Sequence, residues 1–261
     1  MADIAGYNQG QVSDEGQVNW RGDQVSVTPG NQSVYDTSAV KLADLGSRKV
    51  VGDRVFRYAQ AGGTINAGDL VQVGPVGVAQ QIINVTAGTV NNSGGKIFSF
   101  YFATSYAANV FADGYLISQS GTAANMGQIY KVKSHASVSD TAKANLVLYD
   151  PLKRAANVTD KWSLFQNPYK YVTQNTAGTA SPVGVAGVAC TTGDFVWLQT
   201  YGPCCVKAGI GAAEGVAVGA GATGQVAGLT VVTNAVPDPV GFAMQTLTVS
   251  ERGMVWLTIA P

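Results

Sequence analysis

Glycine constrains the fold of this chain more than any other feature, because 32 of its 261 residues are glycine and they occur along its whole length. Glycine in the interior of a helix is destabilising, whereas it supplies the positive φ angles that tight turns require. The glycines follow no Gly-X-Y period, so the chain is not collagen-like. This usage predicts many turns and few long helices.

Short β-prone segments lie between the turns. Residues 96–102 are rich in aromatic side chains, and in residues 128–134 Tyr130 and Val132 alternate with two lysines. Such alternation is typical of a half-buried strand. Hydrophobic residues make up 46% of the chain, which excludes disorder of the whole chain. We therefore predict an all-β fold.

Residues 1–50 are expected to form an extended N-terminal arm. Its first part is dominated by Asn, Gln, Ser, Gly and Asp, with isolated apolar residues, and such a segment cannot bury enough area to fold alone. It is therefore either a mobile tail or an arm that becomes ordered on a neighbouring subunit. The second interpretation is favoured, because a tail has no need of large apolar side chains. The arm residues expected to contact a partner are Trp20, Val25, Val27 and Tyr35.

One short helix is predicted within this arm, over residues 39–45. Asp36 or Thr37 can cap its N-terminus, and Gly46 can end it.

A basic stripe follows the predicted helix. Four cationic side chains fall within ten residues, although Asp53 interrupts them. The stripe is either a solvated strand face or a contact with an acidic partner surface. Its residues are Arg48, Lys49, Arg54 and Arg57, and the three arginines are our candidates for partner contact.

The distribution of charge predicts an inserted domain. Residues 175–261 hold only four acidic and two basic side chains, whereas residues 111–174 hold four acidic and seven basic ones. We therefore predict a main β domain formed by residues 51–110 and 175–261, with an inserted small β subdomain at 111–174.

An internal echo supports two related hairpins in the C-terminal part. The sequence Val-Gly-Val-Ala at 183–186 resembles Val-Gly-Phe-Ala at 240–243, and each is followed by a segment that contains Val-Trp-Leu. The offset is 57 for the first element and 59 for the second. Residues 67–74 and 213–219 form a second, weaker echo. Trp197 and Trp256 are expected at equivalent positions in the hydrophobic core.

The low charge of the chain predicts a surface that other subunits cover. Charged residues make up 12% of the sequence, about half the roughly 25% of ordinary soluble domains. The sixteen basic and sixteen acidic side chains balance, so the chain as a whole lacks a basic footprint for nucleic acid. No apolar run approaches the ~20 residues of a membrane span. We therefore expect a homo-oligomer that binds neither nucleic acid nor membrane.

The residue patterns that usually carry enzyme chemistry are absent from the sequence. Ser134 and His135 are adjacent on a predicted strand, so they point to opposite faces, and this single histidine is expected at the surface. No Gly-x-Ser-x-Gly elbow and no phosphate-binding loop occur. The three cysteines include no Cys-x-x-Cys pair and imply no disulfide framework. We expect a non-enzymatic protein without a metal or cofactor.

Short β motifs along residues 35–261 resemble structural proteins of tailed-bacteriophage heads, and in particular the capsid decoration, or cement, proteins. The resemblance implies a β-sandwich or β-tulip-like fold. It also implies a homotrimer or other small oligomer, made in the host cytoplasm, that binds the major capsid protein on the capsid exterior. The motifs lie at 50–59, 61–63, 68–71, 111–117, 128–133, 148–152, 167–169, 183–186, 195–202 and 254–259.

A binding module is the alternative expectation. A phage fibre or surface protein could hold host glycans with its Trp and Tyr side chains. Exposed aromatic rings beside Asn and Asp in a groove would favour this function, whereas buried tryptophans and an arm ordered by a partner would favour the cement protein.

Overall fold

The computed structural model confirms the all-β prediction. It describes residues 32–74, 80–84, 91–101, 105–120, 127–139, 143–156, 160–176, 180–229 and 239–260, and none of these residues lies in a helix.

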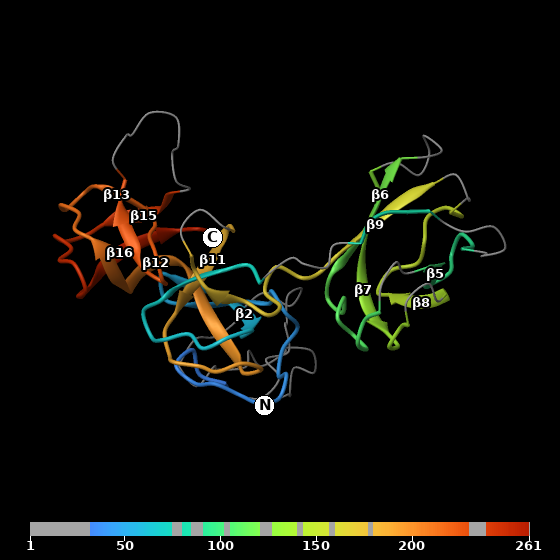
Figure 1. Ribbon diagram of the computed structural model, residues 1–261, viewed down its shortest axis with the longest axis horizontal. Helices are drawn as coiled ribbons and strands as arrows, with labels where there is room; N and C mark the ends of the chain where they lie inside the picture. Colours follow the sequence, from blue (N-terminus) through green and yellow to red (C-terminus); the bar gives the residue numbers. More distant parts are fainter. Residues whose placement is uncertain are drawn as a thin grey trace, which may run out of the picture. The chain divides into compact units, whose positions relative to one another are not determined.

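The chain folds as two units; in Figure 1 the labels β5 to β9 mark strands of unit 2, and the other strand labels mark unit 1. Unit 1 comprises Met1–Gly74 and Tyr169–Pro261, and unit 2 comprises Pro75–Pro168. The insertion thus begins at Pro75, not at residue 111, and ends at Pro168, not at residue 174. The aromatic segment near residue 100 explains the difference, because its strand pairs with residues 143–147 inside the insertion. Its sequence alone resembles a strand of the main domain.

Unit 2 is a six-stranded antiparallel sheet in the order β4-β9-β6-β7-β8-β5. Its core is built from inward-facing apolar residues of these strands, among them Phe98, Leu116, Leu146 and Trp162. The strands are β4 (Gln80–Asn84), β5 (Ile97–Tyr101), β6 (Tyr115–Ser120), β7 (Ile129–His135), β8 (Lys143–Leu148) and β9 (Lys161–Phe165).

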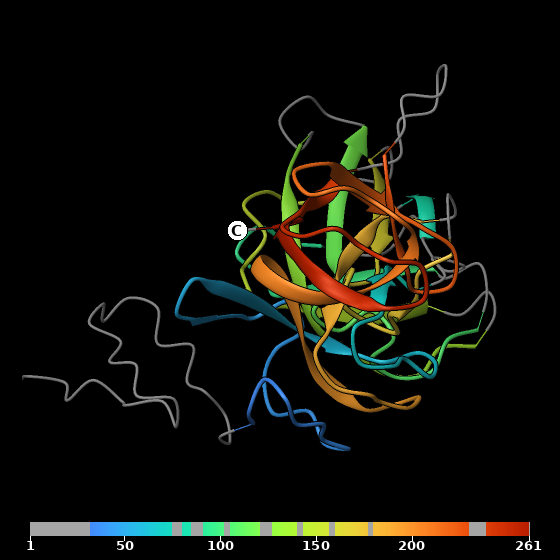
Figure 2. The same cartoon turned by 90° about the vertical axis from the view of Figure 1, so that its left-hand side faces the viewer.

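Unit 1 holds a ten-stranded sheet in which the 16-residue strand β12 is shared by two groups of strands. Figure 2 shows β12 as a long curved orange ribbon beside the red C-terminal strands. The strands are β1 (Arg48–Val51), β2 (Arg54–Gln60), β3 (Leu70–Gln72), β10 (Thr173–Gln174), β11 (Pro182–Ala186), β12 (Phe195–Ile210), β13 (Ala217–Ala220), β14 (Val226–Gly228), β15 (Pro239–Ala243) and β16 (Arg252–Thr258).

These two groups of strands form an internal repeat. Repeat 1 consists of β2, β3, β10, β11 and the first part of β12, and repeat 2 of the last part of β12 with β13, β14, β15 and β16. In repeat 1 Tyr58 pairs with Trp197, and in repeat 2 Cys205 pairs with Met254. The partners therefore differ between the repeats by 147 and 57 residues.

The other strand pairs of repeat 1 also have equivalents in repeat 2. Val71 pairs with Gly184 as Val218 pairs with Gly241, again with offsets of 147 and 57. The short strands β10 and β14 are also equivalent, because each pairs with the corresponding strand, β3 or β13, at the same register. The internal echo in the sequence is thus the visible part of a repeat of five strands.

Each repeat has its own apolar interior. Ala59, Val71 and Leu198 lie in the core of repeat 1, and their equivalents Val206, Val218 and Val255 lie in the core of repeat 2. The insertion leaves repeat 1 between β3 and β10, where repeat 2 has only the residues between β13 and β14. Unit 2 therefore replaces a turn of the repeat.

Residues 32–47 pack on repeat 1, and the predicted helix over 39–45 is wrong. Ser38 bridges to Phe195, and the Leu42 amide donates a hydrogen bond to the Tyr58 hydroxyl. A helix of two turns is marginal by itself, so tertiary contacts decide its conformation. The later part of the predicted 1–50 arm is thus an integral part of unit 1.

Candidate partner-contact surfaces

A basic corner forms at the hairpin of β1 and β2. Arg48 is exposed on β1, directly opposite the half-buried Arg57 of β2. Arg54 lies over the rings of Tyr35 and Phe56, and it donates a hydrogen bond of 2.6 Å to the Tyr35 hydroxyl. The four described candidates for partner contact therefore all lie in this hairpin and the segment before it, Arg48 beside Arg57 and Arg54 beside Tyr35.

Two of the cations in this corner also have structural roles. Arg57 donates to the carbonyl of Gly46, and Lys49 donates to the carbonyl of Gln32 and lies 5.6 Å from the centre of the Trp197 ring. Arg48 is the exposed arginine of the three. It is thus the residue of the corner that can be changed with least effect on the fold.

Three further candidates, Trp20, Val25 and Val27, lie outside the described residues.

The two tryptophans predicted in the core differ in burial. Trp197 is 4% exposed and packs with Tyr58 and Phe195. Trp256 is half-buried and lies between Tyr201 and Phe242. They are not equivalent, because the register gives Met254 as the counterpart of Trp197. The expected offset of 59 residues comes from aligning the two Val-Trp-Leu sequences, whereas the strand pairing gives an offset of 57 residues between equivalent positions.

The outer surface of repeat 2 carries exposed apolar side chains that sequence reasoning missed. Phe242 and Met254 are each 42% exposed, and Cys205 is the exposed cysteine of the three. Trp256 stacks on Phe242 at 6.4 Å and meets Tyr201 edge-on at 5.9 Å. Strand pairing places these side chains side by side. We call this surface the aromatic face; its residues are Tyr201, Pro203, Cys205, Phe242, Met254 and Trp256.

Period-2 alternation in β16 could have indicated this face. Met254 and Trp256 alternate with the buried Val255 and Leu257, so two large apolar side chains point away from the core. We expected Trp256 in the core instead, because charged residues are rare around it.

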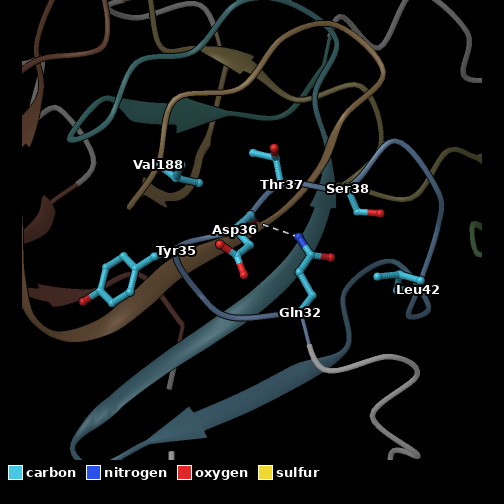
Figure 3. Close-up of a pocket in the computed structure, with 7 residues that line it drawn as sticks. All are labelled: Gln32, Tyr35, Asp36, Thr37, Ser38, Leu42 and Val188. Carbon is cyan, nitrogen blue, oxygen red and sulfur yellow. Dashed lines mark hydrogen bonds between the residues drawn. The ribbon is translucent and has the colours of Figure 1, made fainter. Parts of the chain in front are cut away.

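A shallow hollow of about 560 Å³ lies where residues 32–42 cross repeat 1. Figure 3 shows the Gln32 amide donating to the carbonyl of Asp36, a bond of 2.9 Å that shapes the loop. Tyr35 is 55% exposed at its rim, and Asp36 is exposed beside it. The hollow is lined by Gln32, Tyr35, Asp36, Thr37, Ser38, Leu42 and Val188.

His135 is buried, although we expected it at the surface. Its Nε2 accepts a hydrogen bond from the Phe111 amide, and its Nδ1 lies 2.7 Å from the Ala136 carbonyl. These contacts hold a loop of unit 2 in place, which is a structural role.

Among the described residues, no group of three or more His, Cys, Asp and Glu side chains is arranged to hold a metal ion. The same part of the chain contains no helix with the length and hydropathy needed to span a bilayer.

Comparison with protein-family models, with curated proteins and with solved structures gave no match.

Proposed function

We propose that this chain is a non-enzymatic virion structural protein, a cement or decoration protein on the outside of a phage capsid. It joins subunits of the major capsid protein and associates with copies of itself as a homotrimer or another small homo-oligomer. It is made in the host cytoplasm and then becomes part of the virion.

The aromatic face is the observation that carries this proposal. Large apolar side chains exposed together on one sheet surface are typical of protein–protein contacts. The face also includes Pro203, Cys205 and Met254, which suit contact with a protein surface better than contact with the hydroxyl groups of a sugar. The low charge of the whole chain and the resemblance of its motifs to phage head proteins support the same function.

The basic corner is the surface that we assign to the shell. Arg48 is exposed there, and Arg54 of the same hairpin is held in position by Tyr35. Charges at the rim of an interface mainly change association rate and salt dependence. The corner would thus meet an acidic surface of the major capsid protein.

Binding to expanded shells of the major capsid protein from the same genome tests this function. We expect the purified chain to co-sediment with the shells to saturation. Arg48→Glu should weaken binding by roughly fivefold, which corresponds to about 1 kcal/mol. Lys143→Glu is the matched control, because Lys143 is an exposed cation of unit 2. Absence of binding by the unmodified chain would overturn the proposal.

The hollow beside Tyr35 favours a second candidate, a fibre or surface module that contacts host glycans. An exposed ring next to the Asp36 carboxylate could stack on a sugar and accept its hydroxyl hydrogen bonds. Binding to an array of host surface glycans, lost in Asp36→Ala, would support this candidate. An array without signal, together with shell binding, would exclude it.

A further inference from the structure

The two repeats differ in what covers their equivalent outer surfaces. In repeat 1 Tyr58 is 0% exposed and Trp197 is 4% exposed. Their equivalents in repeat 2 are the exposed Cys205 and Met254, of which Met254 is 42% exposed. Phe242 differs from its equivalent Val185 for another reason, because Val185 is 0% exposed within the core cluster of repeat 2. The aromatic face is therefore a surface that is covered in one repeat and open in the other.

A segment of the chain itself covers this surface in repeat 1. Val34, Ala43 and Leu45 are buried against Tyr58 and Trp197, and they come from the residues that precede β1. The cover is not a regular strand or helix; it is a loop with spaced apolar side chains. Its chemistry is that of an arm with isolated large residues between polar ones.

In the part of the chain that the structure describes, repeat 2 has no corresponding segment, for a topological reason. The cover of repeat 1 is the chain that leads into its first strands. The first strand of repeat 2 is the last part of β12. The residues before it are the first part of β12, which already belongs to repeat 1. A cover for repeat 2 must therefore come from elsewhere.

We propose that residues 1–31 of a second copy of this chain cover the aromatic face. This segment is the chain that precedes the cover of repeat 1, and it carries Trp20, Val25 and Val27 between polar residues. The low charge of the chain favours a second copy as the source, because it indicates surface buried between subunits. The inference rests on the proposed function only in its assumption of self-association.

Charge supports this occupant. Residues 1–31 hold four acidic side chains and one basic side chain. Lys207 and Arg252 pair across β12 and β16 immediately beside Cys205 and Met254. Arg252 contacts the carbonyl of Ala67, and within the described residues neither cation forms an ion pair. An acidic segment would therefore be attracted to this end of the face.

Cys205 provides a direct test, because its exposed thiol belongs to the face and pairs with Met254. The rate at which a water-soluble maleimide modifies Cys205 is measured by mass spectrometry in the full-length chain. We expect this rate to fall as protein concentration rises, by about tenfold once the concentration is about ten times the dissociation constant. Cys190 and Cys204 are buried and report whether the protein stays folded.

The variants identify the occupant. Removal of residues 1–31 should keep Cys205 fully reactive at every concentration, and a peptide of residues 1–31 added in excess should restore protection. Trp20→Ala and Met254→Glu should each weaken protection, whereas Ile129→Glu, an exposed apolar residue of unit 2, should not.

Three outcomes would overturn the inference. The first is equal reactivity of Cys205 with and without residues 1–31. The second is protection of Cys205 that does not depend on protein concentration, because this would show that the same copy supplies the cover. The third is failure of the peptide of residues 1–31 to protect Cys205. The assay contains no capsid shells, so its failure is distinct from failure of shell binding.

Discussion

Trp197 and Met254 occupy the same position in the two repeats but differ in burial. The Trp197 ring lies 4.9 Å from that of Tyr58 and is 4% exposed, whereas Met254 is 42% exposed. Removal of the indole should leave a cavity, so we expect Trp197→Ala to lower the free energy of unfolding by about 3–5 kcal/mol. Met254→Ala should lower it by less than about 1 kcal/mol. Urea unfolding followed by circular dichroism compares them, and equal losses would contradict the difference in burial.

The buried thiols predict a loss of stability in alkaline solution. Burial raises the pKa of Cys204 from 9.0 to about 12, and burial with the charge of Asp194 raises the pKa of Cys190 to about 11. The folded protein therefore holds these protons more tightly than the unfolded chain. Their contribution to stability is complete below about pH 9 and is lost as the pH rises from about 9 toward 12.

Thermal unfolding at about pH 7.5 and about pH 10 measures this loss, and the double variant Cys190→Ala, Cys204→Ala should lose less stability than the unmodified chain. A loss of equal size in the variant would assign the effect to other groups.

At the scale of the strands, local patterns predicted more than long-range ones. Glycine usage and the alternation of apolar and polar residues indicated the all-β fold, and the internal echo in the sequence indicated the two related hairpins. The helix over 39–45 was wrong because its conformation depends on contacts with Tyr58 and Phe195. The domain boundary was misplaced because strand pairing, not composition, assigns residues near 100 to unit 2.

The candidate surfaces also differ in whether a local sequence pattern or a long-range contact determines them. Clustered charge in the sequence indicated Arg48 and Arg54 as candidates for partner contact, which stays a prediction. Alternation in β16 could have indicated that Met254 points away from the core, but whether this position is exposed depends on which segment covers each repeat, and no local pattern shows that.

Strand β12 has a positive φ at Gly202, where it passes from repeat 1 to repeat 2. This φ is +86°, and a Cβ atom there would collide with the carbonyl of Asp53. Gly202→Ala should therefore cost backbone strain as well as displacement of the β1–β2 turn, together about 2–4 kcal/mol. Gly52→Ala is the matched control, because Gly52 has a φ of +60° with no atom within 4 Å of the added methyl group. It should cost only about 1 kcal/mol. Equal costs in urea unfolding would contradict the close approach at Gly202.

At the scale of the molecule, the repeat explains why an insertion of this size is tolerated. Unit 2 has its own core, and unit 1 keeps the cores of both repeats without it. The insertion point is a turn, and turns at the surface accept insertions more readily than strands do.

The repeat therefore predicts that unit 1 folds alone once unit 2 is replaced by a short link. The two ends of the insertion are already adjacent, because Gly74 lies against the carbonyls of Lys170 and Tyr171. Repeat 2 joins the equivalent strands β13 and β14 through only the residues 221–225. A chain in which two glycines replace residues 75–168 should thus keep β circular dichroism and a cooperative thermal transition. Removal of residues 239–260 is the contrasting control: it deletes β15 and β16, exposes the core of repeat 2 and should abolish that transition. If the linked chain also lacked a cooperative transition, unit 1 would depend on unit 2 for its stability, and the interpretation of the insertion as a replaced turn would be wrong.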